Sequence, residues 1–481
     1  MVSNLNRVNV TQQGKPAMHR RFPAGSIGKS LNPSQFLKVF FVPHSDSMEK
    51  VKGTPIFRLL AFDHSRTLAP WCAVRSGESP TLRVRRIAHA IEQSNQPRPN
   101  IVEAGLAQLL SLLVALRQVL IAWRPASAGV RRHYGVNRLP QLVALLKVAW
   151  HANLPPRVYY FQRLFRHPTP SAYLEVIDHR ELQLLLRALH AGVDTTVLED
   201  KTAFHAFCTE QGLPTPPILA TYVDGVCENL SSLPDDWKSD LFSKPAVSYS
   251  SRGIACWRYD PSTDSHRDGT TLVARPGLQA RLATLSKGSR LIVQRRLRNS
   301  AELAPISGQA LANCRVVTAR TPDGSVKVLL AALRMGRGEA ITSDEPTHSF
   351  CAAVNLQTGV LGPAETKQAE GGSFAHHPDS RAPIAGVKLS HWREMTELVL
   401  RAHQGLPQMI FVGWDVIDTE AGPMLLEGNV VWGANLAQMA GNPPLGATGF
   451  PEVFLHYHAQ RQKAVPQDST AIAGRRAFQA R

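Results

Sequence analysis

Cysteine is scarce in this sequence, and its spacing excludes two kinds of stabilised small domain. The 481 residues include six cysteines, and no two of them form a Cys-x-x-Cys pair. A zinc ribbon or a disulfide framework needs such clustering, so neither is expected, and the pattern predicts a reducing, cytoplasmic environment. Cys314 lies beside Arg315 in a predicted strand and could be reactive, but a small buried hydrophobic role is the simpler interpretation.

Acidic residues are scarce in the first fifth of the chain. Residues 1–100 contain 15 Lys and Arg against five Asp and Glu, which is +10 of the net charge of +17. A basic arm of this kind could bind nucleic acid or an anionic membrane surface. It contains no RNP motif, zinc finger or evident helix-turn-helix, and its aromatic residues do not interleave with the basic clusters. We therefore favour a solvated, poorly ordered arm over residues 1–100, with nucleic acid not expected as a partner.

The sequence also lacks a long uncharged hydrophobic run. The most apolar segment, 101–123, is interrupted by Glu103 and Arg117, with 13 residues between them, whereas about 20 are needed to span a bilayer. Small or polar residues recur in this segment at helical spacing, at positions 104, 108, 111, 115, 118 and 122. We expect a mostly buried helix packed closely against a neighbour and no transmembrane span. An interfacial helix is the alternative.

The periodicity of the remaining chain predicts a mixed architecture. Residues 101–195 are expected to be mainly helical, with Asp178 and Glu181 forming a capping box. From 196 onward, short strands alternate with helices between Pro and Gly turns, which is an α+β pattern. We divide this part into subdomains at 196–300 and 301–460, followed by a polar tail at 461–481. No internal repeat is found.

The most informative segment is 409–429, which reads MIFVGWDVIDTEAGPMLLEGN. Two apolar runs flank a polar turn, so a β-hairpin is predicted. Glu427 and Asn429 are two residues apart and project from the same face of a strand. Asp415 joins them if the register pairs the strands around the turn. Three oxygen-bearing side chains on one face suit Mg²⁺, and the alternative is a set of solvated polar residues at the rim.

A second candidate site lies at 241–253, LFSKPAVSYSSRG. Lys244 ends a short apolar run and faces a Ser-rich loop, where an ammonium and backbone N–H groups can converge on phosphate. No Gly-Lys-Ser/Thr opens a helix here, so this is not a Walker loop. A surface lysine before a turn is the alternative interpretation.

Further strands follow between these two segments. Residues 290–297 (RLIVQRRL) predict a strand, and residues 314–334 predict a hairpin that carries Arg315 and Arg334 around the turn at 322–325. Residues 375–380 (AHHPDS) predict a loop whose histidines either face a substrate or serve only the loop.

The order of these motifs resembles the ATP-grasp superfamily, and most of all its sugar-transfer-associated domains, which are related to alpha-L-glutamate ligases. The resemblance covers residues 130 to 460, and its most specific motif is Asp…Glu-x-Asn. The segments that carry it are Lys201 before an amphipathic helix, Gly-Leu-Pro (212–214), Lys244 with Pro245, the strand at Gln294, NCRVVT (313–318), ALRMG (332–336), GWD…LLEGN (413–429), and, for the subgroup, GVNRLPQLVALL (135–146), LPPRVYYFQRLF (154–165) and AHHPDS (375–380).

The resemblance implies an ATP-grasp fold, in which two α+β subdomains clasp ATP, preceded here by the helical region and the basic arm. It also implies a role for each matching residue. Lys201 and Lys244 would contact the nucleotide phosphates, Gln294, Arg295, Arg296 and Leu297 would read the adenine edge, and Glu302 would reach the ribose; Asp415, Glu427 and Asn429 would hold Mg²⁺, and Arg315 and Arg334 would stabilise the transferred phosphoryl group or a substrate carboxylate.

The implied activity is ADP-forming ligation of a carboxylate to an amine or similar nucleophile through an acyl phosphate. The subgroup suggests sugar-linked substrates and a role in making cell-surface polysaccharide or a peptide-like metabolite. One departure bears on turnover: the loop after Lys244 has little glycine and contains the bulky Tyr249 and Arg252. A nucleotide-binding module without turnover is therefore an alternative, and binding of nucleic acid or an anionic surface through the arm is another.

Overall fold

The computed structural model describes residues 79–94, 101–166, 169–230, 237–247, 253–269, 271–338, 340, 342–343, 349–368 and 371–464. The chain divides into two compact units, Met1–Ala61 and Phe62–Arg481, and every described residue belongs to the second. Most of the predicted basic arm, Tyr249 and Arg252 of the loop, and residues 465–481 of the predicted tail lie outside the described residues.

The first sheet has the strand order β2-β1-β7-β3-β4-β5-β6. Its strands are β1 (Ile218–Val223), β2 (Val226–Leu230), β3 (Leu241–Pro245), β4 (Ala255–Asp260), β5 (Ser265–Asp268), β6 (Thr271–Ala274) and β7 (Arg290–Arg295). Helix α11 (Arg275–Leu285) packs Leu278 and Leu282 against Leu291 and Val293 of β7. Because strand residues alternate between faces, Gln294 belongs to the face opposite to α11.

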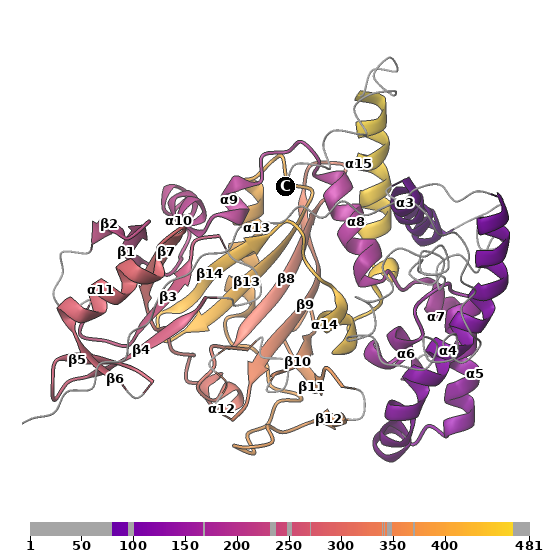
Figure 1. Ribbon diagram of the computed structural model, residues 1–481, viewed down its shortest axis with the longest axis horizontal. Helices are drawn as coiled ribbons and strands as arrows, with labels where there is room; N and C mark the ends of the chain where they lie inside the picture. The colour runs from indigo at the N-terminus through magenta and orange to yellow at the C-terminus, as the bar shows by residue number, and fades with distance from the viewer. Residues whose placement is uncertain are drawn as a thin grey trace, which may run out of the picture. The chain divides into compact units, whose positions relative to one another are not determined.

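The second sheet has the order β12-β11-β10-β9-β8-β13-β14, and all its neighbouring strands are antiparallel (Figure 1). Its strands are β8 (Asn313–Arg320), β9 (Val326–Gly336), β10 (Ser349–Val354), β11 (Leu361–Thr366), β12 (Ser373–Phe374), β13 (Phe411–Thr419) and β14 (Gly422–Asn429). The predicted hairpins at 314–334 and 409–429 are both present, as β8–β9 and β13–β14.

Helices cover both faces of the second sheet. On one face, α13 (Trp392–Gln404) packs on a core that includes Cys314 and Val316 of β8. On the other face, Val317 and Ala319 of the same strand join a core with the helices α3 (Pro80–Ser94), α8 (His179–Leu189), α14 (Asn435–Met439) and α15 (Phe450–Ala464). This alternation is the period of two expected of a strand buried on both faces. Arg315 therefore projects from the face of Val317, not from the face of α13.

Among the remaining described helices, the two consecutive helices α4 (Ile101–Tyr134) and α5 (Arg138–Trp150) are long and the others are shorter. The shorter ones are α6 (Arg157–Phe161), η3 (Leu164–Arg166), α7 (Pro170–Leu174), α9 (Thr196–Glu199), α10 (Lys201–Glu210), α12 (Ala304–Ser307) and η6 (Leu445–Ala447). Asp178 caps α8, and Glu181 bonds back to its backbone, as the capping-box prediction required.

Residues 80–94 differ from the expectation of a poorly ordered arm, because they form helix α3. Val84 and Ala88 are one helical turn apart and fully buried against the second sheet's helices. Arg85 is also held, since its Nη2 donates to the carbonyl of Ala152 at 2.7 Å and its Nε lies 3.3 Å from Glu181 Oε1. Because residues 1–100 are basic overall, the apolar stripe that Val84 and Ala88 form was not predicted from the sequence.

The described side chains of helix α4 are also less buried than the sequence predicted. Ala115 of the predicted stripe is buried, and Val119, which is outside that stripe, packs in the core of the helical region. Leu113, Leu116 and Leu120, however, are exposed. Within the described part of the chain, no helix combines the length and hydropathy required to cross a bilayer.

A buried ion cluster fixes the helical region to the second sheet. Glu365 of β11 is fully buried and accepts hydrogen bonds from Tyr134 Oη at 2.8 Å and Arg163 Nε at 3.2 Å. Arg166 makes a further ion pair with the same carboxylate. Two guanidinium groups and a hydroxyl offset the desolvation of one carboxylate. The pair of elements α4 and η3 is thereby held against β11.

Two buried histidines of the second unit predict a loss of stability in acid. His190 donates from Nδ1 to the Leu186 carbonyl at 3.0 Å and accepts from the Ile410 N–H at 3.3 Å. His403 donates to the Met409 carbonyl at 3.0 Å and accepts from Thr318 Oγ1 at 2.6 Å. Both rings are therefore neutral, and burial lowers the pKa of each to about 4 from an ordinary value of 6.5.

Because the unfolded chain binds these protons near pH 6.5 and the folded chain only near pH 4, stability is full above pH 6.5 and falls as the pH drops towards 4. At pH 5 the expected loss is about 2 kcal/mol of unfolding free energy per histidine. Urea denaturation at pH 7 and pH 5 measures it. His190→Gln should remove about half of the difference, and the exposed His376→Gln should leave it unchanged; an equal effect of both variants would contradict this origin.

Candidate active site

The pairing of three strands places the predicted acidic residues in one row across the second sheet. Asp415 of β13 lies opposite Arg315 of β8 on one side and Glu427 of β14 on the other. Directly paired residues of antiparallel strands project from the same face. Asn429 lies opposite Gly413, two residues from Asp415, so its side chain belongs to that face too. The structure thus brings together the three residues expected to hold a metal.

Two glycines of this hairpin are needed for close packing around the row. A Cβ on Gly413 would lie 2.6 Å from the Cβ of Trp432, and a Cβ on Gly428 would lie 2.6 Å from Leu198 Cδ2. Both distances are shorter than real Cβ contacts. The glycines in GWD and EGN therefore let Trp432 and helix α9 approach the strands that carry the acidic residues.

Asp415 is buried and paired with two arginines. Its Oδ1 accepts from Arg315 Nε at 2.6 Å, its Oδ2 accepts from Arg315 Nη2 at 3.1 Å, and Arg334 Nη2 lies 4.0 Å from Oδ1. Burial by itself would raise the pKa of Asp415, but the charges of Arg315 and Arg334 outweigh it and lower the pKa to about 2. The carboxylate is therefore charged throughout the physiological range.

Glu427 has the opposite electrostatic balance. Burial and the charge of Asp415 raise its pKa, although Lys201 and Lys244 act to lower it. Its Oε2 lies 3.9 Å from Lys201 Nζ, and its Oε1 lies 3.4 Å from the Asn429 side-chain nitrogen. Two carboxylates that disfavour each other's charge form a place where a cation is stabilising.

The two predicted lysines come from different elements and meet near this row. Lys244 pairs with Ile292 of β7 and is buried, and Lys201 begins α10 after its N-cap, Asp200. Lys201 Nζ and its backbone N–H both donate to the carbonyl of Ala246, two residues beyond Lys244. The pKa of Lys244 is lowered to about 8, mainly by burial and also by the charge of Lys201, against the raising effect of Glu427 and Asp415.

The connection between the two sheets passes through residues 212–216. The backbone N–H of Leu425 in β14 donates to the carbonyl of Pro214 at 2.9 Å, and Thr215 Oγ1 donates to the carbonyl of Leu425 at 2.9 Å. This joins the entry to β1 directly to the hairpin with the acidic residues. The Gly-Leu-Pro segment therefore positions the sheet of Lys244 relative to the sheet of Glu427.

The predicted adenine-reading segment lies at the end of β7. Gln294 is buried opposite Phe242, and its Nε2 donates to the carbonyl of Pro216 at 2.9 Å. Arg296 donates from Nη2 to the carbonyl of Gln309 at 3.0 Å, Arg295 is exposed, and Leu297 is half-buried. These positions are compatible with a hinge strand, and the adenine contact stays a prediction.

Glu302 is not placed with the other predicted residues. Its carboxylate accepts a hydrogen bond from the backbone N–H of Ser390 at 3.1 Å, just before α13. Because α13 packs on the face opposite to Arg315, nothing here supports a ribose contact, and that role also stays a prediction.

One residue near the row was missed by the sequence reasoning. Asn313 is buried, lies opposite Arg334, and donates a hydrogen bond that helps to keep the pKa of Asp415 low. The only sequence signal for it is the spacing of two residues between Asn313 and Arg315 in a strand.

Two other candidates have structural explanations. Cys314 is fully buried on the α13 face, and burial raises the pKa of its thiol, so it acts as a small hydrophobic residue. His377 is buried, donates to the carbonyl of Gly336 at 3.1 Å and accepts from the backbone N–H groups of Asp379 and Ser380. His377 therefore serves its loop.

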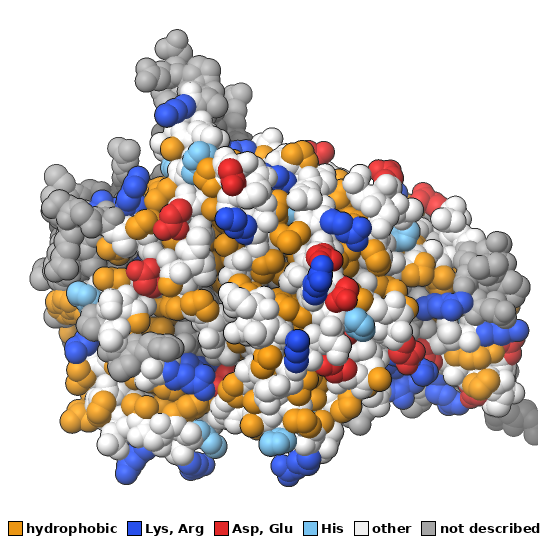
Figure 2. Space-filling model, turned by 180° about the vertical axis from the view of Figure 1, so that it is seen from behind, with side chains coloured by type: hydrophobic (Ala, Val, Ile, Leu, Met, Phe, Trp, Pro, Cys, Tyr) orange, Lys and Arg blue, Asp and Glu red, His pale blue; other side chains and the backbone are white. Residues whose placement is uncertain are grey.

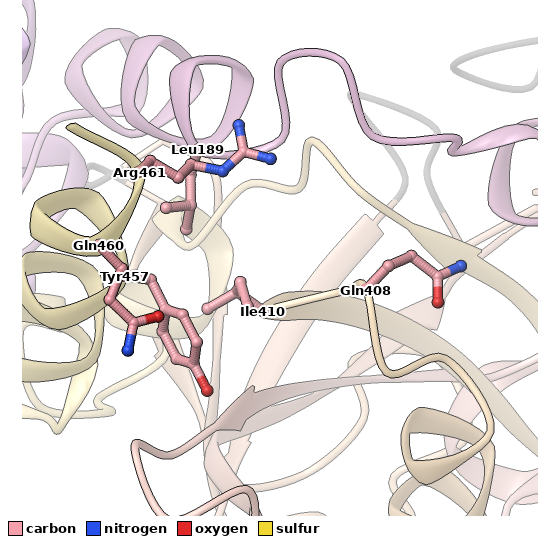
Figure 3. A pocket seen from close by; sticks show the side chains of 6 residues that line it. All are labelled: Leu189, Gln408, Ile410, Tyr457, Gln460 and Arg461. Atoms are coloured by element: carbon pink, nitrogen blue, oxygen red, sulfur yellow. The ribbon is translucent and has the colours of Figure 1, made fainter. Parts of the chain in front are cut away.

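Two cavities among the described residues lie away from the row of charged residues. One, of about 280 Å³, is lined by Leu189, Gln408, Ile410, Tyr457, Gln460 and Arg461. Figure 3 shows that these side chains come from the ends of α8 and α15 and from the segment leading into β13. It contains none of the predicted site residues. A second cavity, of about 370 Å³, lies by the helical region and is lined by Arg157, Val158, Tyr160, Phe161, Gln162, Asp178, His179, Arg180, Lys367, Gln368 and Asn435.

Two antiparallel sheets, with Lys244 on one, carboxylates and arginines on the other, and Lys201 at the start of a helix nearby, define the class of ATP-grasp proteins, whose fold is that of ATP-dependent carboxylate–amine ligases in general. The model of the sugar-transfer associated ATP-grasp family matches residues 183–448, more than half of the chain. The chain therefore belongs to that family, as its motifs predicted.

The chain is similar to D-alanine–D-alanine ligase from Bacillus anthracis complexed with ATP, at 13% identity and TM-score 0.34, over 56% of this chain and 68% of that one. It is also similar to an ADP complex of N5-carboxyaminoimidazole ribonucleotide synthetase, at 11% identity and TM-score 0.32, over 55% of this chain and 56% of that one. A third similar structure is biotin carboxylase from Campylobacter jejuni, at 9% identity and TM-score 0.34, over 54% of this chain and 46% of that one. These scores are low, so the assignment depends on the family match. No curated protein matches the chain.

Proposed function

We propose that this protein is an ATP- and Mg²⁺-dependent ligase that joins a carboxylate to an amine or a similar nucleophile and releases ADP and phosphate. The observation that carries the proposal is the row of Arg315, Asp415 and Glu427 across one sheet. Lys244 and Lys201 are close enough to this row to lower the pKa of Glu427, and the carboxylates of the row in turn raise the pKa of Lys244. Such a cationic site with paired carboxylates is what phosphoryl transfer from a nucleotide requires.

The residues of the hairpin fit a magnesium ion. Asp415, Glu427 and Asn429 offer the carboxylate and amide oxygens that this hard cation prefers. Among the described residues, no three His, Cys, Asp or Glu side chains converge on one point, so the Asn429 oxygen would complete the set. The raised pKa of Glu427 is the sign that a cation is favourable there. When bound, Mg²⁺ would neutralise charge on the phosphate oxygens.

A carboxylate reacts with an amine only after one of its oxygens has been converted into a better leaving group. The substrate carboxylate oxygen would attack the γ-phosphorus, the bond to the ADP oxygen would break, and an acyl phosphate would form. The amine nitrogen would then attack the acyl carbon, phosphate would leave, and the amine would release a proton. Lys201 and Lys244 would bind the phosphates, and Arg315 and Arg334 would stabilise the phosphoryl group or the substrate carboxylate.

The substrate class is proposed from the family. A sugar-transfer association suggests a sugar-linked acid or acceptor, and a role in making cell-surface polysaccharide or a peptide-like metabolite in the cytoplasm. The helical region packs on β11, on the same face of the sheet as Arg334, because Cys351 lies between Glu365 and Arg334. We infer that this region forms the wall on the substrate side.

A second candidate is a nucleotide-binding module without turnover. The low glycine content between Lys244 and Gly253 favours it, because tight closure over a triphosphate needs a flexible loop. Retention of the two lysines together with Asp415, Glu427 and Asn429 favours turnover, because ATP binding alone does not need a full set of metal ligands.

Thermal unfolding with and without Mg·ATP tests nucleotide binding first. At about 100 times its dissociation constant, a ligand adds about 2.7 kcal/mol to the folded state, and a rise of several degrees in Tm is expected for domains of this size. ATP with EDTA should give a smaller rise, because the metal is missing. No rise at millimolar Mg·ATP would contradict the nucleotide site, and a rise without ADP release in acid–amine screens would favour the module without turnover.

A further inference from the structure

Helix α5 exposes an apolar stripe on one face. Leu139, Val143, Leu146 and Trp150 follow the spacing i, i+4, i+7, i+11 and therefore lie on one face of the helix. Their side chains are 39–69% exposed. The opposite face, with Leu145 and Val148, is fully buried. A helix that is apolar on both faces is normally covered on both, so this stripe indicates a further contact.

The adjacent helix exposes a second apolar group. Leu113, Leu116, Leu120 and Ile121 of α4 are 37–54% exposed and lie at helical spacing on one side. The two helices pack together, since Trp123 Nε1 donates to the Arg138 carbonyl at 3.0 Å and Arg138 lies over the Trp123 ring. Single exposed leucines need no explanation, but two such groups on one helix pair do.

Basic residues accompany these apolar groups. Residues 101–151 contain six Arg and Lys, at positions 117, 124, 131, 132, 138 and 147, and only one acidic residue, Glu103. The residues at 124, 131, 132, 138 and 147 are all exposed, and none of them forms an ion pair with another described residue. Figure 2 shows orange hydrophobic and blue basic side chains intermingled on the side where α4 and α5 lie.

We propose that the α4–α5 helix pair is a docking surface for an anionic membrane, which it contacts without crossing. Leucine, valine and tryptophan would enter the boundary between headgroups and acyl chains, and arginine and lysine would contact lipid phosphates. Lys147 follows Val143 by four residues and precedes Trp150 by three, so it borders the apolar stripe on one side of the helix. A protein interface depletes lysine at its core, whereas the headgroup region accommodates both apolar and basic side chains. The inference is independent of the proposed ligase activity.

Sedimentation of the full chain with vesicles tests the proposal. Phosphatidylcholine vesicles are compared with vesicles that also contain about one third phosphatidylglycerol. Binding to the anionic vesicles is expected, together with weak binding to the neutral ones. The double variant Val143→Ser/Leu146→Ser should weaken binding about tenfold through lost apolar burial. Lys147→Gln should weaken it about fivefold, because one basic residue near an anionic surface contributes about that factor.

Matched changes elsewhere serve as controls. Val226→Ser/Leu230→Ser alters two exposed apolar residues of β2, and Lys327→Gln removes an exposed lysine of β9; both should bind as wild type does. All variants should keep their thermal midpoint, because the changed side chains are exposed.

Three results would overturn the proposal. The first is no binding of the wild type to anionic vesicles. The second is vesicle binding by the Val143→Ser/Leu146→Ser variant that is as strong as that of the wild type. Such a result would assign the vesicle binding to another basic segment, such as residues 1–78. The third is a wild-type dimer in solution that this variant dissociates, with no vesicle binding, which would make the surface an interface between copies of the chain.

Discussion

Replacing Glu427 by Gln is expected to lower Mg²⁺-dependent ADP formation by about 10²- to 10³-fold, the cost of losing one charged contact to a developing transition state. The amide keeps the shape of the side chain but removes the charge beside Lys201 and Lys244. Because burial and Asp415 raise the pKa of Glu427, its charged form is disfavoured in the folded chain. The free variant should therefore be as stable as wild type.

The measurement combines ADP release with thermal unfolding. Glu427→Gln should keep the midpoint of the free protein and lose the rise caused by Mg·ATP. Glu420→Gln is the matched control, because Glu420 is an exposed residue in the turn of the same hairpin. If Glu427→Gln and Glu420→Gln released ADP equally fast, the metal assignment to the hairpin would be wrong.

The hairpin itself was predictable because its signals are local. Alternating residues, a polar turn and a separation of two between Glu427 and Asn429 determine their common face. Asp415 was expected to join them if the strands paired around the turn, and the register between β13 and β14 does pair Asp415 with Glu427.

The contacts of Asp415 were not predictable, because they are not local. Arg315 is 100 residues away in the chain, and its pairing with Asp415 depends on the register between β8 and β13. A slip of one residue would turn Arg315 to the α13 face. The family resemblance assigned Arg315 to the transferred phosphoryl group or a substrate carboxylate, and the structure adds that its guanidinium binds both oxygens of Asp415.

The helices were harder to predict than the strands, for a physical reason. In α3, the buried Val84 and Ala88 lie among arginines, so overall charge suggested a solvated arm. In α4, the apolar residues surround the helix, and the pattern cannot show which side a partner covers. In the structure, Ala115 is buried and Leu116 is exposed. Burial of a helix is a property of its neighbours, whereas the alternation of a strand belongs to the strand.

Lys244→Met is expected to weaken Mg·ATP binding about 10- to 100-fold, because a charge-assisted contact to phosphate contributes about 1.5–3 kcal/mol. Methionine retains the apolar stem in a buried position, and burial already disfavours the ammonium, as the lowered pKa of Lys244 indicates. The free variant should therefore remain folded. Titration calorimetry with Mg·ATP measures the change, and Lys287→Ala, at an exposed lysine of the same subdomain, is the control.

The pH dependence of binding separates the charge of Lys244 from its shape. In the free protein, the pKa of Lys244 is about 8, below its ordinary value of 10.5, so the ammonium is present at pH 7 and lost as the pH rises through 8. If only the charged form binds phosphate, affinity should fall about tenfold between pH 7 and pH 9. Lys244→Met should bind weakly at both pH values and lose this dependence, whereas Lys287→Ala should keep it. Two results would show that another group binds the phosphates. One is a wild-type affinity for Mg·ATP that is constant from pH 7 to 9, and the other is a tenfold fall that the Lys244→Met variant keeps.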